Sequence, residues 1–165
     1  SEKKKQMLGD DFTAAVDLIK EDDIDTALIA LERITDKASD GYVTMAKMKK
    51  AAMLIEKKEI DEGLAIYEDL ERTAVDQSFK DMSSILFILN AIDHRSSDEL
   101  IARVDRLTLN SSWKFSALEL KGFILLKDKK YDNAKEIFNE IIKLRNAPST
   151  LAGRARDMLD YIEGK

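Results

Sequence analysis

Few residues of this sequence belong to the types that perform chemistry in proteins. The chain has no cysteine and one histidine, so thiol nucleophiles, disulfide bonds and zinc–thiolate sites are excluded. His94 precedes Arg95 at the expected end of a helix, and no carboxylate stands at metal-ligand spacing from it. An imidazole is favoured at a helix C-terminus by the helix dipole. We therefore expect a structural place for His94, and we predict no catalytic residue, no metal ligand, no cofactor and no enzymatic activity.

Two charged clusters invite a functional interpretation. Asp22, Asp23 and Asp25 together could suggest calcium, but they lack the loop spacing and the distal glutamate of a calcium-binding hand. They precede a predicted helix, where carboxylates are stabilised by the helix dipole. Five lysines lie between residues 47 and 58, with glutamates and no aromatic residue among them. That pattern favours a solvated helix face over a nucleic-acid site.

The composition predicts a helical globular chain. Of 165 residues, 44% are hydrophobic and 36% are charged, which is too apolar for a disordered tail. Six glycines and one proline are too few for many short strands and turns. A net charge of -5 does not indicate a nucleic-acid-binding protein. The longest apolar run, 85–89, is far shorter than the ~20 residues that cross a bilayer.

An internal repeat sets the expected architecture. A segment of similar pattern begins at Ile24, Ile60, Ser97 and Tyr131, with spacings of 36, 37 and 34 residues. This period is typical of a two-helix repeat unit. Each copy has an acidic residue at its second place and apolar residues at its eighth and eleventh, which share one helix face. Small residues stand where two helices must approach closely; they are Ala27, Gly63 and Ala134.

Each copy is preceded by a second helical pattern. These first helices are predicted at 6–20, 43–57, 79–93 and 113–127. Asp40–Gly41 is expected to break the chain between the first two units, and a capping box of Ser96 and Glu99 is expected to start the third recurring segment. We thus predict an all-α fold with a single domain over 1–165, a solenoid of about four helical hairpins. The expected units are 6–36, 43–73, 79–109 and 113–146, followed by a capping helix at 149–163.

The fourth unit resembles the tetratricopeptide repeat. Gly122, Tyr131, Ala134 and Phe138 match that family's small and aromatic positions, while Leu118 stands at its tryptophan position. The other three units match less closely. The resemblance implies a tetratricopeptide-like helical-hairpin solenoid with an inner surface that binds other polypeptides.

Four stretches in order along the chain are similar to one bacterial subfamily. They are 41–46, 78–82, 112–119 and Pro148 with 154–156. The chain thereby resembles the tetratricopeptide-repeat-like family of the ancillary SecYEG translocon subunit. This resemblance implies an inner-membrane protein with one N-terminal span, whose periplasmic domain works beside the SecYEG translocon and periplasmic chaperones. The span itself is not in this sequence. A cytosolic adaptor or assembly factor of the same architecture is the alternative that the residues leave open.

The first helices carry an aligned apolar stripe, which predicts a protein-binding groove. Its members recur three and four residues apart on one helix face. They are Phe12, Met45, Met48, Met82, Ile85, Leu89 and Phe123. Thioethers and aromatic rings adapt to varied partners, so the stripe suits a scaffold that binds apolar segments of other proteins. Burial of the whole stripe in the core is the alternative. The oligomeric state is left open.

A second set of small and aliphatic residues is expected to be buried between helices. It comprises Ala15, Ala51, Ile88 and Gly122, with Leu18, Leu54, Ala91 and Leu125 three residues further on.

Overall fold

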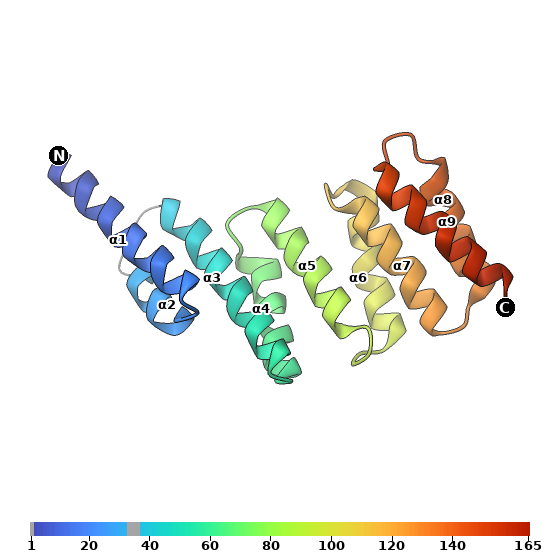
Figure 1. Cartoon of the computed structure of the whole chain (residues 1–165), viewed down its shortest axis with the longest axis horizontal. Coiled ribbons are helices and arrows are strands. Elements are labelled where there is room, and N and C mark those ends of the chain that lie inside the picture. The colour runs from blue at the N-terminus through green and yellow to red at the C-terminus, as the bar shows by residue number, and fades with distance from the viewer. Residues whose placement is uncertain (1, 33–36) are drawn as a thin grey trace. The chain divides into compact units, whose positions relative to one another are not determined.

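The computed structural model describes residues 2–32 and 37–165, and within these ranges it is helical and contains no strand (Figure 1). The helices are α1 (Glu2–Lys20), α2 (Ile24–Glu32), α3 (Lys37–Glu56), α4 (Ile60–Thr73), α5 (Gln77–Ala91), α6 (Ser97–Asn110), α7 (Lys114–Lys127), α8 (Tyr131–Lys143) and α9 (Ser149–Glu163). The predicted all-α class is therefore confirmed for the described residues.

The second helix of each predicted hairpin begins where the repeat predicts, whereas the first helices begin at Glu2, Lys37, Gln77 and Lys114. The recurring segment opens α2, α4, α6 and α8, each of which starts at the first residue of its copy. The Ser96 side chain accepts a hydrogen bond from the Glu99 backbone N–H at 3.3 Å, which confirms the expected cap of α6. The last helix has the predicted bounds, 149–163.

The expected break at Asp40–Gly41 is wrong. Both residues lie inside α3, which begins at Lys37. A single glycine costs a helix about 1 kcal/mol relative to alanine, and the continued helix carries Tyr42 and Val43 onto the core cluster around Ala46. Residues 33–36, the end of the first predicted unit, lie outside the described residues.

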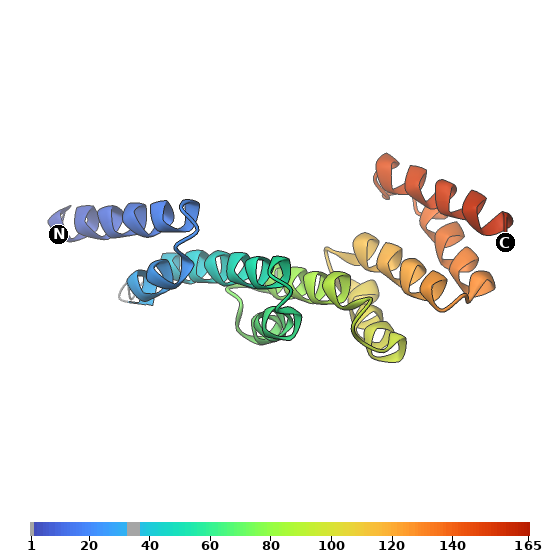
Figure 2. The same cartoon turned by 60° about the horizontal axis from the view of Figure 1, so that its bottom comes forward.

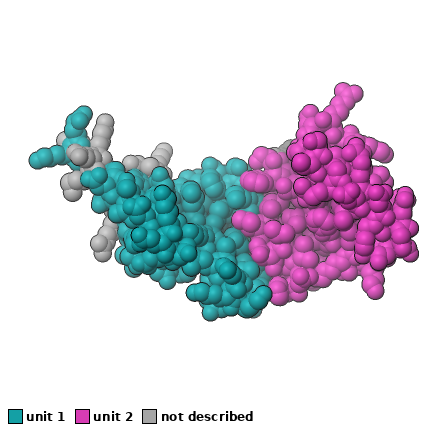
Figure 3. All heavy atoms as spheres, viewed as in Figure 1, with its two compact units in different colours: residues 1–83 teal, residues 84–165 magenta. Residues whose placement is uncertain are grey.

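The chain divides into two compact units, residues 1–83 and 84–165 (Figure 3). The division falls within α5. In the first unit, α1 packs against α2, α2 against α3 and α3 against α4. In the second unit, α6, α7, α8 and α9 pack in the same sequential way. α1 also touches α3, and α7 touches α9, and each of these pairs runs in one direction (Figures 1 and 2). Packed helical hairpins are thus the building blocks of both units.

The recurring apolar positions form the cores. Leu31, Tyr67, Val104 and Phe138, at the eighth place of the four copies, are all buried. The eleventh place is buried in the three copies where it is described, at Leu70, Leu107 and Ile141. Burial raises the pKa of the Tyr67 hydroxyl, which is 3% exposed, so this side chain stays neutral within the core.

The second predicted set also lies between helices. Ala15, Ala51, Ile88, Ala91 and Gly122 are buried, and its three leucines are partly buried. The three small residues of the recurring segment, Ala27, Gly63 and Ala134, are buried as expected. A Cβ atom on Gly63 would lie 2.9 Å from the Ala51 carbonyl oxygen, which fixes the close approach of α4 to α3.

Gly122 faces the ring of Phe138 so closely that no larger residue fits. A Cβ atom at this position would lie 2.5 Å from Cζ of the fully buried Phe138. We predict that Gly122→Ala lowers the free energy of unfolding by about 1–2 kcal/mol, because overpacking outweighs the helix propensity gained. Gly153→Ala is the control, since no atom lies within 4 Å of a Cβ added in α9. That variant should be up to about 1 kcal/mol more stable in urea unfolding; a stabilising Gly122→Ala would contradict the packing.

Three hairpin turns close in the same way, without glycine. Asp22, Lys58 and Lys129 have positive φ angles of 63°, 68° and 57°. Each lies two residues after α1, α3 or α7 and donates its N–H to the last turn of that helix, and the next residue donates to the carbonyl five residues back. This pair of hydrogen bonds defines the Schellman motif, in which glycine adopts the left-handed conformation most easily.

Lys129→Gly should therefore stabilise the second unit. We expect the free energy of unfolding to rise by about 1 kcal/mol, since the left-handed conformation strains a side chain with a Cβ atom. Lys130→Gly provides the matched control, because Lys130 has a φ of -84° and glycine there only adds freedom to the unfolded chain. Equal shifts of the urea midpoint in both variants would refute this account of the turn.

Candidate protein-binding surface

The predicted stripe residues divide between the two units. Phe12 lies on α1, Met45 and Met48 lie on α3, and Met82 lies on the part of α5 that belongs to the first unit. In the second unit, Ile85 and Leu89 lie on the remainder of α5, and Phe123 lies on α7. All of them are on first helices of hairpins, as the repeat register requires.

Met45 and Leu89 are the most exposed members of the stripe. Met45 is 52% exposed and Leu89 is 53% exposed. Met48 and Met82 are partly buried, and Ala52, one turn beyond Met48, is exposed. On α3, Met45, Met48 and Ala52 therefore form an apolar strip that is exposed at Met45 and Ala52 and partly buried at Met48.

The other stripe residues contribute to the cores. Phe12 stacks on Tyr42 with 5.1 Å between ring centroids and packs against the core cluster of the first unit. Phe123 lies 6.0 Å from the Phe138 ring and packs against the core of the second. Ile85 is only 9% exposed. In each unit, some of the predicted stripe residues thus lie in the core and others lie at the surface.

In α7, an ion pair occupies the register position that holds apolar stripe residues in α1, α3 and α5. Glu119 of α7 is in register with Phe12, Met48 and Ile85. Its carboxylate accepts two hydrogen bonds from Arg154 of α9, from Nε at 2.8 Å and from Nη2 at 3.1 Å. These bonds and the charge of Glu119 raise the pKa of Arg154, a guanidinium that is already charged at ordinary pH. The capping helix therefore places polar groups at this stripe position.

The aspartate cluster binds lysines of the next helix. Lys49 Nζ lies 2.9 Å from Asp22 Oδ1 and also donates to the Ile19 carbonyl at 2.9 Å. Lys50 Nζ lies 2.7 Å from Asp25 Oδ1. Two of the three aspartates thus tie the α1–α2 hairpin to α3. In the described part of the chain, no three acidic or histidine side chains are grouped so as to hold a metal ion.

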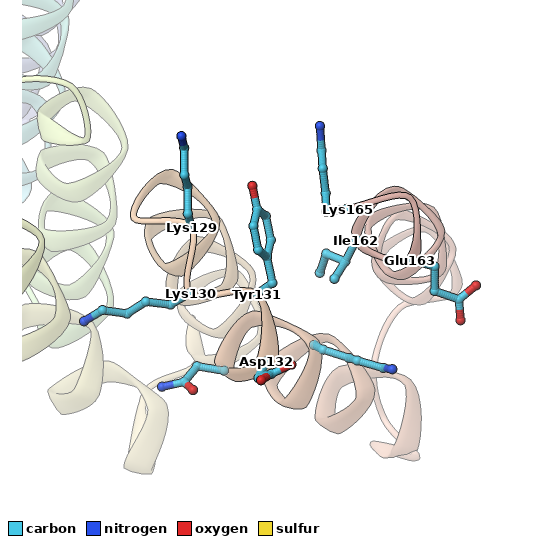
Figure 4. A pocket seen from close by; sticks show the side chains of 9 residues that line it. Lys129, Lys130, Tyr131, Asp132, Ile162, Glu163 and Lys165 are labelled. Atoms are coloured by element: carbon cyan, nitrogen blue, oxygen red, sulfur yellow. The ribbon is translucent and has the colours of Figure 1, made fainter.

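A depression of about 600 Å³ lies between the start of α8 and the end of α9 (Figure 4). Lys129, Tyr131 and Lys165 extend in the same direction beside it, and Asp132 and Glu163 add carboxylates to its lining. His94 is elsewhere, exposed in the turn after α5, where its backbone N–H donates to the Ala91 carbonyl at 2.8 Å. Its place after a helix agrees with the sequence.

Sequence patterns missed several surface features. The Figure 4 depression and a smaller one between α2 and α4 are not foreshadowed by any motif. Ile29, Val75, Leu109 and Tyr161 are exposed apolar residues outside the stripe, with Leu109 at 77%. The repeat register holds no signal for the smaller depression, because the position of Lys47 is taken by Asp11, Ser84 and Leu118 in the other three units.

Comparison with models of known families, with curated proteins and with solved structures finds no match to this chain. Among the described helices, none combines the length and the apolar character needed to span a bilayer.

Proposed function

We propose that this chain is a non-catalytic scaffold that binds other proteins through the apolar faces of its first helices. The exposure of Met45 and Leu89 carries the proposal. Each is the exposed end of an apolar strip on its own helix, with Met48 on α3 and with Ile85 on α5, and such strips mark interaction surfaces more often than scattered single residues do. Stacked helical hairpins also present such faces in regular order, which suits an extended or helical ligand.

The side chains of the stripe favour weak binding to partners of many different sequences. Full burial of a methionine or leucine side chain stabilises a complex by roughly 1.5–3 kcal/mol. Two or three such contacts, less the cost of association, give weak binding that exchanges quickly. Methionine side chains adapt to differently shaped partners, so sequence discrimination at Met45, Met48 and Met82 should be low. Such a surface suits transient contact with unfolded or partly folded chains.

The finer assignment rests on the resemblance of four sequence stretches. By that resemblance the chain is a tetratricopeptide-like solenoid, and the protein carries one N-terminal membrane span. On that basis we propose a periplasmic location beside the SecYEG translocon and periplasmic chaperones, which are sites where unfolded chains occur. A cytosolic adaptor would need the same binding surface. Labelling the native protein with a membrane-impermeant reagent in intact cells distinguishes the two locations.

Site-specific photocrosslinking tests the binding surface. A photoreactive amino acid is placed at Met45 or Leu89, and at the exposed residues Thr26 and Ala102 on second helices as controls. The probe is a reduced, carboxymethylated protein that cannot fold. We expect crosslinks from Met45 and Leu89 well above those from the controls. Equal crosslinking at all four positions would reject the proposed surface.

A further inference from the structure

A small apolar depression in the first unit lies apart from the stripe. It measures about 270 Å³ and is formed by α2, α3 and α4. Leu28, Ala65 and Ile66 supply its apolar lining, and its charged lining residues are Lys47, Lys50 and Asp69. The volume is below the ~300–1,000 Å³ of sites for whole small molecules. A single aliphatic side chain is therefore a better match to this depression than a cofactor.

Of the three charged side chains that line the depression, two have a partner and one does not pair with any described side chain. Lys50 is bound to Asp25 at 2.7 Å. Asp69 accepts hydrogen bonds from Arg72 Nη2 at 3.0 Å and from the Thr73 hydroxyl at 3.3 Å. Lys47 pairs with no side chain that the structure describes, although it is partly buried. The depression thus combines an apolar lining with one ammonium group that has no carboxylate partner among the described side chains.

Leu118 of the second unit shows an aliphatic side chain at the register position of Lys47. Both lie 13 residues before the start of their recurring segment, where the other two copies have Asp11 and Ser84. Leu118 is 6% exposed and belongs to the core cluster of its unit. An aliphatic residue at this register position is therefore compatible with the fold. The lysine in the first unit places a cation at the edge of apolar surface that a leucine would help to cover.

We propose that this depression docks a segment of another polypeptide in which an aliphatic side chain stands next to a carboxylate. The aliphatic group would cover Leu28 and Ile66, and the carboxylate would pair with Lys47. A charge-assisted bond of this kind is roughly twice as strong as a neutral hydrogen bond. Lys47 lies roughly 160° around α3 from Met45, at 100° per residue. The site is therefore separate from the stripe, and it stands or falls independently of the proposed function.

Two short peptides test the site by NMR titration of the whole isotope-labelled chain. The first is acetyl-Gly-Glu-Leu-Glu-Gly-amide, and the second has glutamine in place of both glutamates. We expect the acidic peptide to shift amide signals near Leu28, Lys47 and Ile66, and to bind about tenfold more tightly than its neutral counterpart. Equal affinity for the two peptides, or shifts confined to other helices, would overturn the proposal.

A variant that reverses the charge of Lys47 is the second part of the peptide-binding test. Lys47→Glu should weaken the acidic peptide at least about tenfold, while Lys57→Glu, an exposed position after α3, should leave its affinity nearly unchanged. Lys47→Leu serves if the glutamate variant unfolds, since Leu118 shows that leucine is accepted at this register position. It should also abolish preference for the acidic peptide. Retained preference in a folded Lys47 variant would refute the role of this residue.

Discussion

Phe138→Ala is expected to lower the free energy of unfolding by about 3–5 kcal/mol, the largest stability effect of any single substitution considered for this chain. The ring is fully buried in the core of the second unit, against Gly122 of α7 and near Phe123. Truncation removes the contacts of the whole ring and leaves a cavity that the two helices cannot close. Urea unfolding followed by circular dichroism measures the change.

The effect of Phe138→Ala should be concentrated in one part of the chain. Stacked helical units contact their neighbours in sequence, so distant helices need not unfold together. Hydrogen exchange should accelerate in α7, α8 and α9 and much less in α1 and α2. Phe123→Ala is the matched control, because this ring is only partly buried; its cost should be about 1–2 kcal/mol. A cost below about 1 kcal/mol for Phe138→Ala would contradict the described core.

Met45→Asp and Leu89→Asp should each weaken binding of an unfolded protein about tenfold, without unfolding the chain. Each replacement removes an apolar contact and adds a carboxylate that loses its hydration when the partner binds. A tenfold loss of affinity corresponds to about 1.4 kcal/mol. Because both side chains are about half exposed, the aspartates remain hydrated in the free protein. Fluorescence anisotropy with a labelled, reduced and carboxymethylated protein gives the affinities.

The control variants carry the same charge at exposed positions outside the stripe. Thr26→Asp and Ala102→Asp introduce the same charge at exposed sites on second helices and should change the affinity little. Ile85 is unsuitable for such a test, since it is 9% exposed and a charge there would disturb the core. If the folded Met45→Asp and Leu89→Asp variants bind as well as the parent, the stripe is not the binding surface.

The helical hairpins were predictable because several sequence signals agree. A recurring acidic residue, two apolar residues one turn apart and a small residue at the contact fix the start and the buried face of each second helix. Ile24, Ile60, Ser97 and Tyr131 therefore open helices as expected. The break at Asp40–Gly41 was wrong because glycine alone does not end a helix when the following residues gain packing.

The grading of the stripe was not predictable from periodicity. Ile85 and Leu89 share one face of α5 in sequence terms, yet one is buried and the other is half exposed. Which of them a neighbouring helix covers depends on tertiary packing that the repeat register does not contain. The depression beside Lys47 likewise depends on three helices meeting, and no residue pattern of the repeat indicates it.

Amide chemical-shift mapping with the unfolded carboxymethylated protein tests the central claim most directly. The largest changes are predicted at residues 43–52 of α3 and 82–91 of α5, around Met45 and Leu89. Second-helix residues such as Thr26 and Ala102 should change least. Absence of binding, or changes that are largest on second helices and weak on α3 and α5, would contradict a scaffold that holds other proteins on its first helices.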